Sequence, residues 1–494
     1  MTRALAVACG LPLLLAACNV GPDYRKPEIP VPARFSEAGS AVPAVAQSDL
    51  SKWWTQFQDP VLDALVARAL SANLDLQTAA SRVRQAREQV IVAGAAEWPT
   101  LNANGLGLNL HSNSSPLSQL ASAGAPPGTA PSATPTNIKL YSLGFDATWE
   151  LDVFGGTRRA VEAAQANSEA ALWELHDGEV TLTAEIANDY LGLRAAQARI
   201  ALLEEELKDQ RQMLDLVRAR AKNGFVTQLD VNQQRALASS TEAQIPDLDA
   251  QSRATMHALA VLLAEPPESV DSALQEAQPM PAAPLAIPAS LPSDLLRRRP
   301  DIRDSERKLA AATANEGAAI AALYPKFNLI GAATFAGSSL SGLLSTDNFG
   351  TVGIGSIMWP IFEGGKIHAN IRSSEEAELQ AYLAYRKSVL GALQNVEDAL
   401  ARYADDGRHV RALEDAESAA ASSAAIAQQQ YANGLVNFIT VLSTETTLLS
   451  ARDQLIQARQ NLAQDFGALY KALGGGWDEA SVDWQTRPSE PENR

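Results

Sequence analysis

The sequence of 494 residues contains only two cysteines, Cys9 and Cys18, and both lie near its start. A framework of disulfides is therefore excluded, and the fold has to be stabilised by packing and by association with other chains. The five histidines are scattered without metal-ligand spacing, and neither a phosphate-binding glycine loop nor a Gly-x-Ser-x-Gly motif occurs. We therefore expect no metal site, no catalytic site and no cofactor.

Positive charge and long apolar runs are also scarce. The formal net charge of −17 argues against a nucleic acid as partner. No apolar run reaches the length of about 20 residues that a transmembrane helix needs. If the chain enters a membrane, we therefore expect it to do so through β-strands.

The first 17 residues predict a lipoprotein signal peptide. Arg3 precedes an apolar run, Leu5 to Ala17, that is too short for a stable membrane anchor. The run ends in Leu-Ala-Ala-Cys18, which looks like a bacterial lipobox, so Cys18 is predicted to carry a covalent lipid. Asn19 follows, and by the usual bacterial sorting pattern a residue other than Asp at this position favours the outer membrane. The alternative is an ordinary signal peptide with an incidental cysteine.

The middle of the sequence contains an internal duplication. Two pairs of matching segments are separated by 210 residues: Trp149–Gly155 with Trp359–Gly365, and Asn223–Val231 with Asn433–Val441. Nearer the N-terminus, Asn73–Leu76 matches Arg299–Ile302 at a separation of 226 residues. Two constant offsets indicate one duplicated unit with a single change in length. A repeat of about 200 residues is too long for a solenoid unit, so it predicts duplication of a whole strand-and-helix module.

Each copy begins with a helix and a strand pair. Apolar and polar residues alternate from Tyr141 to Leu151, which suits a strand with one face toward lipid and one toward water. The predicted pairs are 101–110 with 141–151 and 327–336 with 351–361. The alternative is an ordinary soluble sheet.

A long helical hairpin is predicted after each strand pair. Ile186, Leu193, Ile200, Leu207 and Leu214 recur every seven residues, and Val389, Val396, Tyr403 and Val410 do the same in the second copy. Heptad repeats predict coiled-coil packing. The 67 residues from Gly155 to Ala221 would form a helix about 100 Å long at ~1.5 Å per residue. Asn-Gly pairs at 223–224 and 433–434 supply the turns.

These features divide the chain as follows. A signal peptide (1–17) and a lipidated, extended tether (18–58) precede a first repeat (59–290) with its hairpin at 155–264. A second repeat (291–476) has its hairpin at 365–473, and a tail follows (477–494). The sequence thus predicts a mixed α+β membrane protein, which the resemblance described below identifies as a mixed α+β membrane channel. Because four strands cannot close a barrel and an open edge cannot face lipid, other copies of the chain must complete it.

Four segments resemble the NodT-type branch of the TolC-like outer-membrane efflux lipoproteins: Cys18–Pro27, Trp53–Pro60, Leu295–Ile302 and Leu469–Trp477. The resemblance implies a homotrimer in outer-membrane lipid, whose 12-stranded β-barrel takes four strands per chain and continues as a periplasmic α-helical barrel. It implies a passive exit duct for small molecules, supplied by a periplasmic adaptor and an inner-membrane pump of the resistance-nodulation-division type. A duct for type I protein secretion and a non-conducting coiled-coil scaffold are the alternatives.

The resemblance also implies functional positions at the periplasmic turns. Asp230 and Tyr431 occupy positions where TolC-like channels have gate contacts, whereas Val436 stands where TolC has its gating Arg. Thr440 and Ser443 stand where related channels carry pore-facing Asp. We therefore take Asp230, Tyr431, Thr440 and Ser443 as gate candidates and expect weaker polar and steric contacts to close the gate. Asn223, Gly224, Asn433 and Gly434 are the candidate adaptor contacts.

Overall fold

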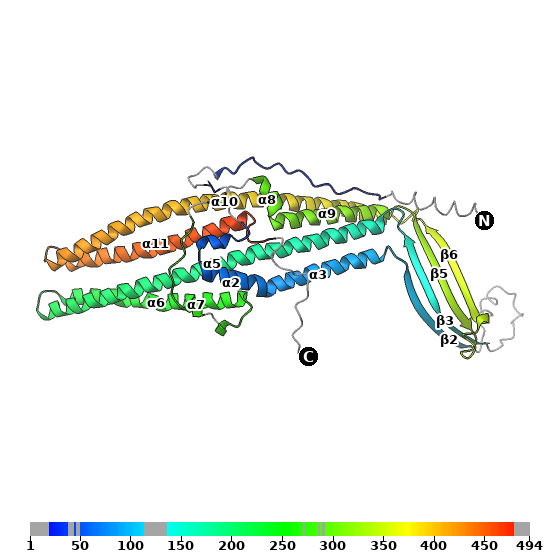
Figure 1. The fold of residues 1–494 in the computed structure, drawn as a ribbon, viewed down its shortest axis with the longest axis horizontal. Helices are drawn as coiled ribbons and strands as arrows, with labels where there is room; N and C mark the ends of the chain where they lie inside the picture. The colour runs from blue at the N-terminus through cyan, green and yellow to red at the C-terminus, as the bar shows by residue number, and fades with distance from the viewer. Residues whose placement is uncertain are drawn as a thin grey trace, which may run out of the picture. The chain divides into compact units, whose positions relative to one another are not determined.

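The computed structural model describes residues 19–37, 44–45, 50–112, 136–269, 272–284, 287–288 and 292–478 (Figure 1). The chain separates into two compact units. The first comprises Met1–Arg25, Ala86–Ser168 and Lys308–Ala381, and the second comprises Lys26–Gln85, Glu169–Arg307 and Tyr382–Arg494. Within the described residues, none of the helices combines the length and the apolar character needed to traverse a membrane.

The first unit holds an antiparallel sheet of four strands in the order β2-β3-β5-β6. The strands are β2 (Thr100–Ser112), β3 (Thr136–Leu151), β5 (Lys326–Gly337) and β6 (Phe349–Met358), and they lie side by side in Figure 1. In this register Thr100 pairs with Thr148 and Phe335 with Phe349. The two edge strands, β2 and β6, therefore each have one partner strand within the described part of the chain.

The observed strands differ from the predicted ones mainly at their ends. β6 begins at Phe349 and stops at Met358, although the repeat predicted a strand over 351–361. Pro360 explains the early end, because proline has no N–H to donate to a ladder. The Ser-, Pro-, Ala- and Gly-rich composition of Ser112–Thr136 predicts an exposed loop between the first two strands. Ser112 and Thr136 belong instead to β2 and β3, and residues 113–135 lie outside the described residues.

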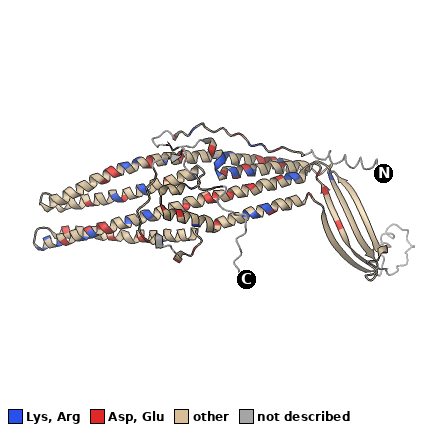
Figure 2. Cartoon of the chain, viewed as in Figure 1, with Lys and Arg blue, Asp and Glu red and all other residues tan. Residues whose placement is uncertain are grey.

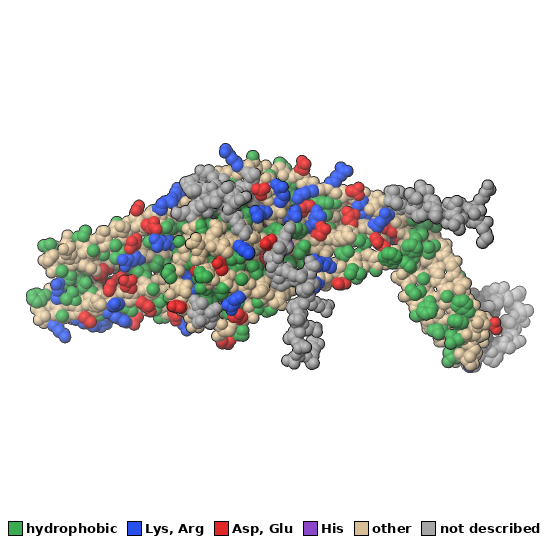
Figure 3. Space-filling view, in the orientation of Figure 1, with side chains coloured by type: hydrophobic (Ala, Val, Ile, Leu, Met, Phe, Trp, Pro, Cys, Tyr) green, Lys and Arg blue, Asp and Glu red, His purple; other side chains and the backbone are tan. Residues whose placement is uncertain are grey.

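Apolar side chains are exposed along the strands, whereas charged ones are rare there. Figure 3 shows hydrophobic side chains gathered over the sheet, and Figure 2 shows most Lys, Arg, Asp and Glu on the helices. The exposed apolar residues include Leu101, Leu106, Leu143, Phe145, Val352 and Ile354. An apolar surface of this extent marks a surface that meets a partner or lipid.

The duplication is visible in helix lengths. Helices α3 (Leu74–Ala95) and α9 (Pro300–Ala321) each have 22 residues and start 226 positions apart. Helices α5 (Gly156–Lys222) and α10 (Lys366–Ala432) each have 67 residues and start 210 positions apart. Their return helices have 35 residues each, at the same offset of 210: α6 (Gln228–Leu262), which continues through Pro246, and α11 (Phe438–Ala472).

Shorter elements complete the second unit. Helix α2 (Pro60–Ala72) follows Asp59, whose carboxylate caps it by accepting from the backbone N–H of Val61 at 2.9 Å. Further short elements are η3 (Pro267–Ser269), α7 (Ser272–Gln275), α8 (Pro292–Arg298) and a two-residue parallel pairing of β1 (Ala44–Val45) with β4 (Ile287–Pro288).

The heptad positions of the long helices are buried as the repeats predict, except for Ile200, which is only half-buried. Ile186, Leu193 and Val396 have no measurable exposure, and Leu207, Leu214 and Val410 are also buried. The sequence of α3 predicts an apolar side with Val83, Val90 and Ile91. This prediction is only partly correct, because Val83 is buried whereas Ile91 is exposed.

The predicted tether over 18–58 requires a correction. Residues 19–37 have little regular structure, but Trp53–Phe57 forms a 3-10 helix, η2, that packs against α11. The Trp53 side chain is fully buried, and its ring centroid lies 5.9 Å from that of Tyr470. Gly467 makes room for it, since a Cβ there would lie 2.9 Å from the indole. The proline-rich composition that predicts an extended segment covers 19–50, whereas Trp53–Phe57 lies beyond it and has aromatic residues that favour burial.

We expect the substitution Trp53→Ala to destabilise the protein by about 3–5 kcal/mol, because it leaves a cavity among aromatic rings. The measurement is the thermal unfolding of the detergent-solubilised protein. Phe225→Ala is the matched control, since Phe225 is an exposed aromatic residue on the same unit. Equal unfolding temperatures for the two variants would show that η2 is not a structural part of the second unit.

Candidate functional site: the hairpin ends and the N-terminal clasp

The two helical hairpins of the second unit end in equivalent turns. We call 220–231 and 430–441 the hairpin ends. Gly224 and Gly434 have φ values of +75° and +74°, which favour glycine. The N–H of Phe225 donates to the Arg220 carbonyl at 3.0 Å, and that of Leu435 donates to the Gln430 carbonyl at 2.9 Å. Both turns thus have the 6→1 hydrogen bond of a Schellman motif.

The return helices begin with side-chain caps, and one of them uses Asp230. The Asp230 carboxylate accepts from the backbone N–H and the hydroxyl of Thr227, each at 2.8 Å, and the Thr227 hydroxyl accepts from the Asp230 N–H in return. This is a capping box. In the second hairpin Asn437 caps α11 by accepting from the N–H and hydroxyl of Thr440. Asp230 and Thr440 are therefore equivalent capping positions.

Tyr431 lies in the apolar cluster that joins the two hairpin ends. Its ring packs 5.5 Å from that of Phe438, and the Arg220 guanidinium lies 4.9 Å above it. Its hydroxyl is buried and has no hydrogen-bond partner within the part of the chain that the structure describes. Val436, at the position of the gating Arg of TolC, packs against the same cluster. Asp230 and Tyr431 are not hydrogen-bonded to each other within the described chain.

The other predicted residues of the hairpin ends are exposed. Asn223, Gly224, Asn433 and Gly434 all face solvent, and the Asn223 amide donates to the Ala219 carbonyl at 2.9 Å. Ser443 is exposed as well.

The sequence reasoning missed a set of exposed apolar side chains at these ends. Phe225 is 79% exposed and Leu435 is 73% exposed, and these two residues are related by the offset of 210. Leu229 and Ile439 form a second exposed pair with the same offset. A comparison of the repeats residue by residue would have found both pairs. Two equivalent apolar pairs in solvent indicate a surface that meets a partner.

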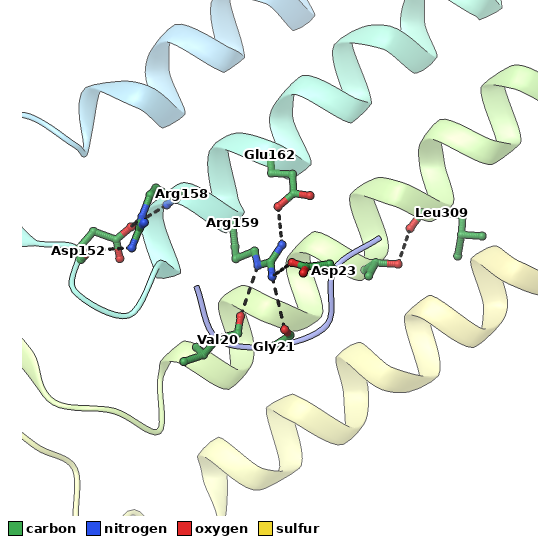
Figure 4. Close-up of polar contacts among 9 residues, drawn as sticks. Val20, Gly21, Asp23, Asp152, Arg158, Arg159, Glu162 and Leu309 are labelled. Carbon is green, nitrogen blue, oxygen red and sulfur yellow. Dashed lines mark hydrogen bonds and ion pairs between the residues drawn. The ribbon is translucent and has the colours of Figure 1, made fainter. Parts of the chain in front are cut away.

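In the first unit, the start of the described chain is fixed to α5. We call residues 19–23 the N-terminal clasp (Figure 4). The Arg159 guanidinium donates to Asp23 at 2.6 Å and to Glu162 at 2.8 Å, and it also reaches the carbonyls of Val20 and Gly21. Burial by itself would lower the pKa of Arg159, but the two carboxylates outweigh it and raise the pKa. The guanidinium therefore stays charged while only 3% exposed.

The clasp also depends on close backbone packing. Gly21 has a φ of +86°, and a Cβ added to it would lie 2.5 Å from the Cα of Gly317 in α9. The Val20 N–H donates to the Phe154 carbonyl at 3.2 Å. Asn19 is thereby held where β3 passes into α5. Cys18, the predicted lipid carrier, lies outside the described residues.

The sequence model of the outer membrane efflux protein family matches residues 65–265 and 291–475, which cover both repeats. The chain belongs to this family. It has the mixed α+β fold of outer-membrane efflux channels, and its role is efflux across the outer membrane.

Relatives of this efflux protein match it over nearly their full length. It is 34% identical over 485 residues to nodulation protein T of Rhizobium leguminosarum bv. viciae, covering 96% of this chain and 94% of that protein. It is 33% identical to the pyoverdine export outer membrane protein OpmQ of Pseudomonas aeruginosa, covering 94% and 95%. Among solved structures, the outer-membrane channel OprN aligns with a TM-score of 0.84 at 34% identity, covering 93% of this chain and 100% of that one.

We expect Arg159→Gln to release the N-terminal clasp, because the substitution removes the charge that holds Asp23. The measurement is limited trypsin cleavage after Arg25 in the full-length efflux protein, which should become faster. Arg158→Gln is the matched control, because Arg158 bonds to Asp152 rather than to the clasp. Unchanged cleavage of Arg159→Gln would contradict the role given to this residue.

Proposed function

We propose that this efflux protein is the passive outer-membrane exit duct of a tripartite system, and that it works as a homotrimer. The observation that carries the proposal is the four-stranded sheet, with its exposed apolar side chains and two edge strands that have one partner each. In hydrocarbon, unpaired backbone groups cost several kcal/mol each. Three copies would close the sheet into a ring, and the 67-residue helices would continue the duct into the periplasm.

We further propose that a covalent lipid on Cys18 anchors the chain to the outer membrane. The N-terminal clasp supports this placement, because it holds Asn19 at the junction of β3 with α5. A lipid on the preceding residue would then lie beside the end of the strands.

The hairpin ends are the proposed contact surface for a periplasmic adaptor, which would connect the duct to an inner-membrane pump of the resistance-nodulation-division type. Asn223, Gly224, Asn433 and Gly434 would let the adaptor approach the backbone, while Phe225 and Leu435 would supply apolar contact area. The pump would provide the energy, and the duct itself would need neither a cofactor nor catalysis. Small molecules are the proposed cargo, because relatives are named for pyoverdine export and toluene efflux.

The gate candidates differ in what the structure allows them to do. Ser443 is exposed and free to face the duct, whereas Asp230 and Thr440 already take part in helix caps. The buried Tyr431 hydroxyl would have to move before it could bond to another chain. We propose that packing of the apolar cluster, with few ion pairs, keeps the gate closed. The free energy needed to open the gate would then be small.

The test is dye accumulation in a bacterium that lacks its own exit channel but carries an intact adaptor and pump. We expect the wild-type chain to lower accumulation. The double variant Phe225→Ser and Leu435→Ser should leave accumulation at the level without a channel, because it removes the apolar contact with the adaptor. Val261→Ser is the matched control, since Val261 is an exposed apolar residue at the other end of α6.

Each variant must reach the outer membrane at the wild-type level, which is measured by membrane fractionation. Full export by the double variant would contradict the proposed adaptor contact. A wild-type chain that assembles in the outer membrane but exports no dye would instead point to a protein-secretion system.

A further inference from the structure

An acidic cavity lies between the two repeats within the second unit. It has a volume of about 520 Å³ and is bounded by α5, α10 and α11. Its polar lining includes Glu205, Glu206, Asp209, Gln210, Gln428 and Glu445. The cavity belongs neither to the hairpin ends nor to the sheet, and the exit-duct role does not account for it.

Two buried acceptor atoms in this lining lack a donor. Glu445 is only 8% exposed; its Oε1 accepts from the Gln428 amide at 3.1 Å, while its Oε2 has no partner among the described residues. Gln210 is 2% exposed, and its amide nitrogen donates to the Glu206 carboxylate at 3.2 Å. Its Oε1 likewise finds no donor within the described chain. An unsatisfied buried acceptor is unfavourable, so a ligand that donates to both atoms would be favoured.

The charge around these atoms is strongly negative. Four carboxylates line the cavity, and the one cationic side chain in the same lining, Arg452, is already bonded to Glu417 at 3.1 Å. Burial raises the pKa of Glu445, and the neighbouring charges of Glu206 and Asp209 raise it further. The pKa of Glu206 is raised by burial as well. A positive ligand would relieve this repulsion.

The oxygen atoms that line the cavity suit an organic cation better than a metal ion. The described residues contain no group of three or more His, Cys, Asp or Glu side chains placed to hold a metal. An alkylammonium group, in contrast, brings three N–H donors and tolerates amide and carboxylate acceptors at varied angles. The volume lies within the range of roughly 300–1,000 Å³ that is usual for small-molecule sites.

We propose that this cavity binds an alkylpolyamine, with one ammonium group donating to Glu445 Oε2 and Gln210 Oε1. The remaining ammonium groups lie against Glu205, Glu206 and Asp209. Because its walls come from α5 of the first repeat and from α10 and α11 of the second, the bound amine joins the two hairpins of one chain. Binding therefore stabilises their packing against each other.

The experiment is isothermal titration calorimetry of spermidine into the detergent-solubilised full-length protein at pH 7.5 and low salt. We expect saturable binding of one spermidine per chain. Glu445→Gln should weaken the affinity by roughly tenfold or more, since a charged hydrogen bond is lost. Glu206→Gln tests a second wall of the cavity and should weaken binding in the same direction.

Asp415→Asn is the matched control, because Asp415 is an exposed acid on α10 and its loss removes the same charge from the chain. This variant should bind spermidine like the wild type. The absence of saturable binding, an unchanged affinity in Glu445→Gln, or equal weakening in Asp415→Asn would each overturn the proposal.

Thermal unfolding of the same proteins provides a second readout that does not depend on one variant. Spermidine at saturation should raise the unfolding temperature of the wild type and of Asp415→Asn. It should raise that of Glu206→Gln and Glu445→Gln less. An equal rise in all four proteins would mean nonspecific attraction of a polycation to an acidic protein, and would also overturn the proposal.

Discussion

The unpaired edges of the four-stranded sheet are the constraint on which the rest of the structure depends. β2 and β6 each pair with a single strand in the described chain, yet the side chains along the sheet are largely apolar. Lipid can cover such side chains but cannot hydrogen-bond to the backbone at the edges. Under the homotrimer proposed above, the edges of other copies would meet these edges in the outer membrane. Association would then be part of the fold.

The long helices must also bury their apolar sides, and both copies of the repeat do so in the same way. A 67-residue helix cannot bury its apolar side against a compact core of its own, so each copy folds it back against a 35-residue partner. The two hairpins then share an apolar cluster at their ends, which includes Val217, Tyr431 and Phe438. Farther along, the same hairpins enclose acidic groups with unpaired acceptors. Apolar packing and acidic repulsion thus act between the same helices.

Much of this architecture could be predicted from the sequence, because an element found in one copy of the repeat predicts its counterpart in the other copy at a constant offset. The helix lengths, the strand order in each pair and the Asn-Gly turns all follow from local periodicity and turn chemistry. The burial of Trp53 could not be predicted, since it depends on Gly467 more than 400 residues away. The capping role of Asp230 could be predicted from the Thr-x-x-Asp spacing of Thr227 and Asp230. The acidic cavity is formed by three helices that are separate in sequence, so no local pattern indicates it.

Disulfide cross-linking between the sheet edges tests the central claim most directly. Cysteines at Gly105 on β2 and Gly353 on β6 find room for a Cβ, and the lipid proposed on Cys18 would block that thiol. Oxidation in outer membranes should give the double variant a covalent ladder that ends at three chains, while each single variant should not form this ladder. A double variant that remains monomeric, or a ladder that continues beyond three chains, would contradict a closed ring of three copies.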